Sequence, residues 1–298
     1  RKAAPSMSAI AERNRALAPS ESRSSTATPP WRRITVGSDI AALSDEWRTL
    51  EAHALVTPYQ AHGWVSAFTA TVGAAHGMEF RHAVLRDAED RPLAILPLVI
   101  TRRLGARFAE FIGGKHANYH MGLYAPGFAA SLDAQGAEAM LRAVAAAIGG
   151  LDAFAFVNQP LRWGDAANPT AQLPASGPSP SGAYKLALDG GDGETTLKRA
   201  MSSHARKKLK NKRNRFAEFG TSELVRARSE SEIERVIGAF LDQKAARFAA
   251  MGIPDPFAEP AMRAFLRKGA LASEDGSAPV LELYSLDVDG RSVATCVG

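Results

Sequence analysis

The sequence predicts an α+β fold in which mixed, mainly antiparallel sheets are flanked by helices. Three observations predict it. Segments that alternate apolar and polar residues, as strands do, stand beside amphipathic helical segments along most of the chain. The order strand, helix, helix, hairpin occurs twice. The 298 residues are 46% hydrophobic, which is enough to bury a core, and the length favours two domains.

The sequence of the first half of the chain predicts the following elements. Residues 1–30 are rich in Ala, Ser, Pro and Arg without periodicity, which predicts a disordered leader. Ser38 or Asp39 caps a helix, and Pro58 begins a second one. Gly149 ends a helix. The expected strands are 31–36, 80–85, 92–101, 108–112, 120–124, 151–157 and 183–188; the expected helices run from 38 to 50, from 57 to about 72 and over 132–148; loops are expected over 113–119 and 160–182.

The second half predicts a basic helix over 194–219 that ends at Gly220, then a strand over 223–228. A capping box over 231–234 opens a helix that reaches residue 250. A shorter helix follows over 260–272. Two strands, 280–288 and 292–297, form a hairpin through Asp289-Gly290, a dipeptide typical of tight turns. Cys296 stands among apolar neighbours, and we expect it to pack in the core.

The two hairpins resemble each other in sequence, since in both an acidic turn, an Arg and a Leu-Ala or Val-Ala step lead into the return strand. A tandem duplication explains this, and chance similarity of two ordinary hairpins is the alternative. Under duplication the domains are 31–190 and 191–298. The second copy then lacks ~85–90 residues that the first copy uses to finish its sheet, so we expect the chain to be truncated within its second domain.

The net charge of +5 is concentrated in one segment, because residues 198–215 hold nine Lys or Arg and no acid. The remaining residues carry 27 basic and 31 acidic side chains, a net charge of −4. One cysteine excludes an internal disulfide and a cysteine-rich zinc site. It suits a reducing cytoplasm, although a cysteine-poor exported protein has the same composition. No apolar run approaches the ~20 residues of a transmembrane helix. No His, Asp or Glu cluster has metal-ligand spacing, so we expect no metal.

On a continuous helix over 194–219, Lys208 and Lys212 lie within the apolar face. Three interpretations remain open. The helix is solvated and its lysine stems cover apolar surface, or it lines a cleft between the two copies that binds a phosphate-bearing substrate or the acyl donor, or it contacts nucleic acid or an anionic membrane. Few aromatic residues are available for base stacking, which argues against nucleic acid.

Two further groups are candidate substrate-binding residues. Lys244 and Arg247 lie on the apolar face of their helix, which indicates a lined cavity or buried ion pairs. The loop after the fourth expected strand gathers polar and aromatic side chains, as ligand loops do, although a plain connecting loop has the same composition. Its candidates are Lys115, His116, Asn118, Tyr119 and His120. His116 or His120 has the chemistry of a general base near neutral pH, but the sequence identifies no catalytic residue.

Several short motifs occur in an order that resembles the GNAT-like acyl-CoA N-acyltransferase superfamily. The resemblance covers residues 31–298 and is closest to the tandem-domain CelD-like group, named for cellulose biosynthesis, and the FemABX proteins. In the loop Gly113 to Tyr119, Asn118 stands where that family has Asp. The other residues that carry it are Trp47-x-x-Leu50, Thr57-Pro58-Tyr59-Gln60, Trp64, Phe68, the segment Arg206 to Gly220, Lys244-Ala-Ala-Arg247-Phe248, Gly252 and Phe257.

The resemblance implies two tandem GNAT-like domains and transfer of an acyl group, such as acetyl from acetyl-CoA, to an amine of a small molecule or envelope-polysaccharide precursor. The family's donor loop, Arg/Gln-x-x-Gly-x-Gly/Ala before a central helix, is not found here. We therefore expect the first domain, 31–190, to have lost donor binding, and no donor-binding residue is assigned within this chain. The alternative is a non-catalytic binding module that holds an anionic polymer or membrane surface through the basic helix.

Overall fold

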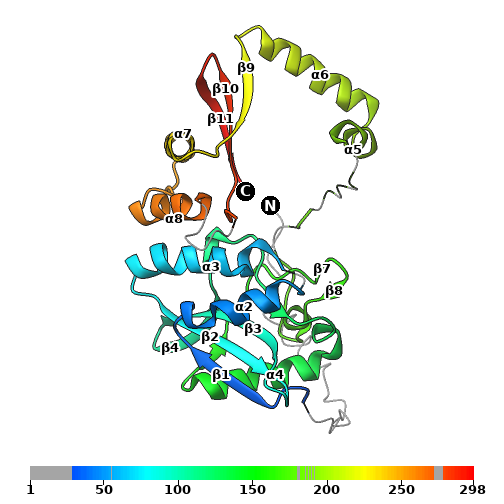
Figure 1. Cartoon of the computed structure of the whole chain (residues 1–298), viewed down its shortest axis with the longest axis vertical. Helices are drawn as coiled ribbons and strands as arrows, with labels where there is room; N and C mark the ends of the chain where they lie inside the picture. Colours follow the sequence, from blue (N-terminus) through cyan, green and yellow to red (C-terminus); the bar gives the residue numbers. More distant parts are fainter. Residues whose placement is uncertain are drawn as a thin grey trace, which may run out of the picture. The chain divides into compact units, whose positions relative to one another are not determined.

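A computed structural model describes residues 29–54, 56–179, 182–184, 186, 188, 190, 192–271 and 278–298 (Figure 1). The chain divides between Pro30 and Trp31, and the second unit, Trp31–Gly298, is compact. The predicted disordered leader therefore lies almost wholly outside the described residues.

The first half of the second unit is built on one sheet. Its strands follow the order β1-β2-β3-β4-β6, and β5 pairs with β3. All pairs are antiparallel except β4 with β6. The mixed, mainly antiparallel sheet of the sequence prediction is thus confirmed. The strands are β1 (Arg33–Gly37), β2 (Glu79–Arg86), β3 (Pro92–Arg103), β4 (Ala106–Phe111), β5 (Leu123–Tyr124) and β6 (Ala153–Phe154), and a separate two-stranded hairpin joins β7 (Arg162–Trp163) to β8 (Ala166–Ala167).

Helices cover both faces of this sheet, and the alternation of side chains along the strands decides which residues meet which helix. Val84 and Ile95 belong to the core that contains α2 (Ser44–Glu51) and α3 (His62–Phe68). Leu85 and Leu96 point the other way, into the core under α4 (Ala134–Ile148). The α4 helix begins where the Asp133 carboxylate accepts from the backbone of Gly136, and it ends at Gly149, whose φ is 75°.

The second half forms a three-stranded antiparallel sheet in the order β11-β10-β9. Its strand pairing repeats that of β1, β2 and β3. Each hairpin also carries a bulge at the equivalent place: the pairing skips Leu93 between Ala94 and Pro92, and Val293 between Ala294 and Ser292. The second-half elements are α5 (Gly193–Ala200), α6 (Ser203–Ala217), β9 (Ser222–Arg226), α7 (Glu230–Met251), α8 (Pro260–Ala270), β10 (Leu283–Val288) and β11 (Arg291–Val297).

One hydrophobic core joins the helices of the two halves. Phe265 of α8 is buried and packs edge-on against Trp64, with ring centroids 5.4 Å apart, and against Phe68 at 5.7 Å. Val236 and Leu283 belong to the same core. Burial of such aromatic and aliphatic side chains is the main stabilising contribution, so α3 and α8 depend on each other.

Local sequence signals place several boundaries correctly. The turn Asp289-Gly290 has two positive φ angles, 47° and 77°, as a tight hairpin requires. The helix α7 ends at Gly252 in the left-handed conformation. Its capping box is present but lies two residues earlier than expected, because Ser229 and Glu232 form it rather than Ser231 and Glu234.

The prediction of a single basic helix over 194–219 is wrong. The helix is interrupted at Met201, whose backbone is extended, with φ −129° and ψ 139°. Ser202 then caps α6 by accepting from the backbone of Ala205. A serine that caps a new helix competes with the continuation of the previous one, and here the cap prevails.

Two further expectations are wrong. The described residues of 183–188 belong to no strand. Cys296 is exposed rather than buried, because it stands on the outer face of β11, opposite Tyr284. In an edge strand with one covered face, apolar neighbours in the sequence do not make a buried position.

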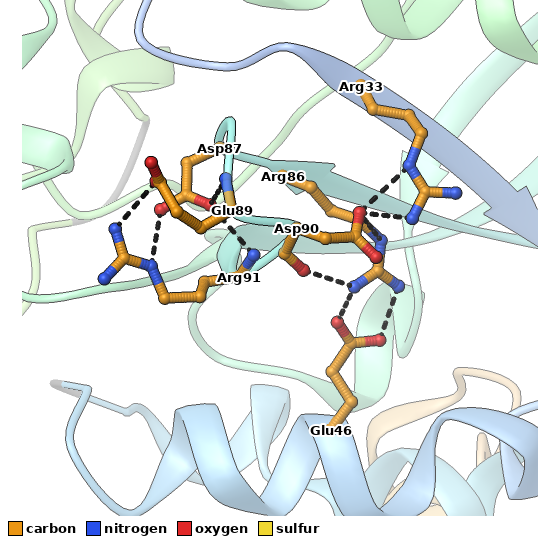
Figure 2. Close-up of polar contacts among 7 residues, drawn as sticks. All are labelled: Arg33, Glu46, Arg86, Asp87, Glu89, Asp90 and Arg91. Carbon is orange, nitrogen blue, oxygen red and sulfur yellow. Dashed lines mark hydrogen bonds and ion pairs between the residues drawn. The ribbon is translucent and has the colours of Figure 1, made fainter.

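The β2–β3 hairpin is tied to the helical layer by ionic contacts (Figure 2). Both terminal nitrogens of Arg86 donate to the Glu46 carboxylate of α2, one of them at 2.7 Å. At the turn, Arg91 donates to Asp87 at 2.8 Å and Asp90 accepts from Arg33 at 3.0 Å. The Arg86–Glu46 pair contributes more to stability than the exposed pairs at the turn, because the Arg86 side chain is only 13% exposed.

Candidate active site

The loop that follows β4 is fixed in place by a glycine and by a buried alanine. Gly113 has a φ of 112°, and a Cβ at this position would lie 2.8 Å from Trp64 and from Ala117. Only glycine fits both the conformation and the space. Ala117 is buried in the core shared by the two halves. The loop therefore presents its side chains from a rigid base.

The predicted site residues of this loop differ in accessibility. Lys115 and Asn118 are exposed, and His116 and Tyr119 are half-buried. His120 is buried, at 2% exposure. A substrate in solution therefore reaches four of the five, and His120 is not accessible.

His116 reaches the second half of the chain. Its ring meets that of Phe257 edge-on, at 5.9 Å between centroids. Phe257 also contacts Phe240 of α7 at 5.3 Å and Phe248 at 6.4 Å. A loop of the first half and the connection between α7 and α8 thus form one aromatic cluster.

Lys244 contributes a cation to the same cluster. Its ammonium nitrogen lies 5.2 Å from the ring centroid of Phe240 and 5.4 Å from that of Phe257. These cation–π contacts explain how a lysine stands on an apolar helix face. They replace the buried ion pair that was one expectation. Arg247, one turn further along α7, is exposed. The structure thus brings His116 and Lys244, which are remote in sequence, into contact with the same phenylalanine, Phe257.

Burial and charge keep the imidazole of His116 neutral near pH 7. Partial burial is the largest cause that lowers its pKa, the nearby charge of Lys115 lowers the pKa further, and Glu259 opposes them. The pKa of His120 is also lowered by burial, which a hydrogen bond from its Nδ1 to the Val157 carbonyl, at 3.0 Å, partly offsets. Both rings are proton acceptors, but only His116 is accessible to a substrate.

Tyr119, in the same loop, belongs to a second group of aromatic rings in the first half. Its ring lies 6.4 Å from that of Tyr59 and 5.1 Å from that of Trp163. The Trp163 indole donates to the carbonyl of Val56 at 3.2 Å, which holds this wall of aromatic rings in position. Such rings offer flat apolar surface for a ligand beside the polar groups of the loop.

The expectation that Lys208 and Lys212 lie on the buried face of a helix is wrong. Both are exposed on α6, and α6 has no buried residue. The break at Met201 removes the continuous apolar face on which that expectation depended. No contact of the described residues brings these two lysines to the His116–Lys244 cluster.

A cavity that the sequence did not predict lies between α2, the start of α3 and the segment after α8. It measures about 370 Å³, and the backbone N–H of His62 at its edge donates to the Glu51 carboxylate at 2.9 Å. The sequence feature that indicates this cavity is the pair Arg48 and Glu51, which lie three residues apart on one helix face beside the Trp47 motif. The cavity is lined by Arg48, Glu51, Ala52, His62, Gly63, Ala278 and Val280.

Within the described residues, no group of three or more His, Cys, Asp or Glu is placed to hold a metal ion. None of the helices in the described part of the chain has the length and hydropathy needed to span a bilayer.

Comparison with known families gives one match. Residues 203–298 match the family described as Acetyltransferase (GNAT) domain. The arrangement of sheets and helices fits a GNAT-like fold. No curated protein matches the chain. The segment from α6 to β11 thus supports a place in the GNAT superfamily and an N-acetyltransferase-like function.

Proposed function

We propose that the protein is an N-acyltransferase that uses acetyl-CoA to acetylate an amine. The match of residues 203–298 to the acetyltransferase domain carries this proposal. The repeated strand order and the equivalent bulges at Leu93 and Val293 support a tandem arrangement, with a first domain over 31–190 and a second over 191–298.

The finer points of the proposal come from the sequence resemblance. We infer that the chain is related to the CelD-like and FemABX proteins and that its acceptor is a sugar amine or another envelope-polysaccharide precursor. A phosphate-bearing acceptor would suit the cation of Lys244. The single cysteine, a free thiol at Cys296, supports a cytoplasmic location.

The chemistry requires that an ammonium group lose a proton before its nitrogen attacks the thioester carbonyl. The C–N bond then forms, the C–S bond breaks, and the leaving thiolate takes up a proton. We assign the role of base to His116. It is neutral near pH 7, it is half-buried, and it lies at the junction of the two halves. His120 has the same chemistry but no access.

Lys244 is assigned to substrate binding. The rings of Phe240 and Phe257 hold the ammonium group in position but do not neutralise its charge, so the group still attracts an anion. We expect Lys244→Met to raise KM for the acceptor more than it lowers kcat. Lys268→Met, at an exposed position on α8, is the matched control and leaves KM unchanged.

Donor binding is tested by thermal unfolding of the protein, expressed to its natural stop codon, with acetyl-CoA. At a concentration 100-fold above the dissociation constant, binding stabilises the fold by ~2.7 kcal/mol, and the midpoint rises by about 5–11 °C. ATP and sodium chloride at equal ionic strength are the controls. The absence of a saturable rise that is specific to acetyl-CoA would count against the proposal.

Catalysis is tested by release of free thiol from acetyl-CoA in the presence of a panel of amines. We expect His116→Gln to lower kcat/KM by about 10²–10⁴-fold, as removal of a general base does. His204→Gln, at an exposed position on α6, is the matched control. Equal activity of the two variants would remove His116 from the mechanism.

A further inference from the structure

The helix α6 has a charge that no described part of the chain neutralises. It carries seven Lys or Arg and no acid over its 15 residues. Arg206 is satisfied locally, since its guanidinium donates to the carbonyls of Lys198 at 3.0 Å and Met201 at 3.2 Å. None of the other six forms an ion pair among the described residues. These six are Lys207, Lys208, Lys210, Lys212, Arg213 and Arg215.

The same helix carries an apolar stripe that the described chain covers only in part, since Ala205 and Phe216 are half-buried and Leu209 is exposed. At about 100° per residue, Ala205, Leu209 and Phe216 fall within an arc of about 40°. Leu209 is 45% exposed, and no residue of α6 is buried. Phe219, just beyond the helix, is 75% exposed, and its ring lies 6.4 Å from that of Phe216. The stripe thus continues into the turn that follows.

Cations border the stripe on both sides. Lys212 and Lys208 lie at about 20° and 60° beyond one edge, and Arg213 lies about 40° beyond the other. A helix with a Leu/Phe stripe flanked by long basic side chains suits the interface of a lipid bilayer: the stripe enters the acyl boundary while the cations contact lipid phosphates.

We propose that α6 binds the surface of an anionic membrane, with Leu209 and Phe216 facing the lipid and the flanking cations at the headgroups. Clusters of four to eight Lys or Arg on an amphipathic helix are typical of such contacts. A nucleic-acid duplex would satisfy the charge but would leave the apolar stripe in water. Outside residues 198–215 the net charge is −4, so the excess of positive charge that attracts an anionic surface is concentrated in α6 and the end of α5. The inference does not depend on the proposed acetyl transfer.

The test is co-sedimentation of the chain with vesicles. We expect binding to vesicles of phosphatidylcholine with one quarter phosphatidylglycerol, no binding to phosphatidylcholine alone, and weaker binding at 200 mM than at 50 mM salt. The triple variant Lys208→Gln, Lys212→Gln, Arg213→Gln should bind about 100-fold more weakly, since each cation near an anionic surface contributes about fivefold.

The matched control changes the same net charge elsewhere, with Arg102→Gln, Arg142→Gln and Lys268→Gln at exposed positions off α6. We expect it to bind vesicles within about threefold of the parent, because long-range attraction is screened. Leu209→Ser, which leaves every charge in place, should weaken binding about tenfold through loss of apolar burial. Circular dichroism checks that each variant is folded.

Three results would overturn the inference. The first is no sedimentation of the parent chain with anionic vesicles at 50 mM salt. The second is an equal loss in the α6 triple variant and in the control triple variant, which would make the attraction one of net charge alone. The third is displacement from vesicles by a 20-base-pair duplex together with indifference to Leu209→Ser, which would assign α6 to nucleic acid.

Discussion

Replacing Phe265 by Ala tests whether the two halves of the chain share one core. The Phe265 side chain is 4% exposed, and it meets Trp64 and Phe68 edge-on at 5.4 and 5.7 Å. A buried Phe→Ala substitution removes about 3–5 kcal/mol from the free energy of unfolding, including ~0.5–1.5 kcal/mol for each aromatic pair. The thermal midpoint should fall by about 6–20 °C.

The assay combines urea denaturation, followed by tryptophan fluorescence, with hydrogen exchange. Because Phe265 belongs to α8 and its partners belong to α3, we expect faster amide exchange in both helices and one cooperative transition. Phe219→Ala, at a 75% exposed position, is the control and should change stability by less than about 0.5 kcal/mol. Faster exchange in α8 with α3 unchanged would refute the shared core, and so would a loss below about 1 kcal/mol.

Three other predictions concern stability. Glu46→Gln removes the anionic partner of Arg86 and should lower the free energy of unfolding, measured by urea denaturation, by about 1.5–3 kcal/mol. Asp90→Asn, at a 60% exposed side chain, should lower it by less than about 1 kcal/mol. Equal losses for the two variants would contradict the importance of burial. Burial lowers the pKa of His82 to about 4 from 6.5, so the unfolded chain binds the proton more tightly and stability falls as pH falls from about 6.5 to about 4. In His82→Phe the fall in the free energy of unfolding between pH 6.5 and pH 4 should be smaller by about 3 kcal/mol. Parallel stability–pH curves of the parent and the variant would disprove this role of His82. Ser229→Ala breaks the capping box of α7 and should cost ~1 kcal/mol in the same denaturation assay; an unchanged midpoint would show that the cap adds nothing.

The site illustrates how far sequence reasoning reaches. The loop of residues 113–120 and the lysine on α7 were both recognised as unusual from local patterns. Their convergence was not predicted, because His116 and Lys244 are linked only through Phe257, whose place depends on how the two halves pack. The assignment of α6 failed for a different reason. Ser202 caps a new helix, so the side-chain angles calculated for one continuous helix do not describe the apolar face of α6.

The sequence by itself determined the α+β class, the repeated element order and most element boundaries. Those features depend on backbone preferences and side-chain alternation within a few residues, as at Asp289-Gly290, Gly149 and Gly252. Only the tertiary structure decided that His116 meets Phe257, that α3 and α8 share a core and that Cys296 is exposed. Such contacts join residues far apart in the chain, and their energy depends on the packing of whole layers, which local pattern does not contain.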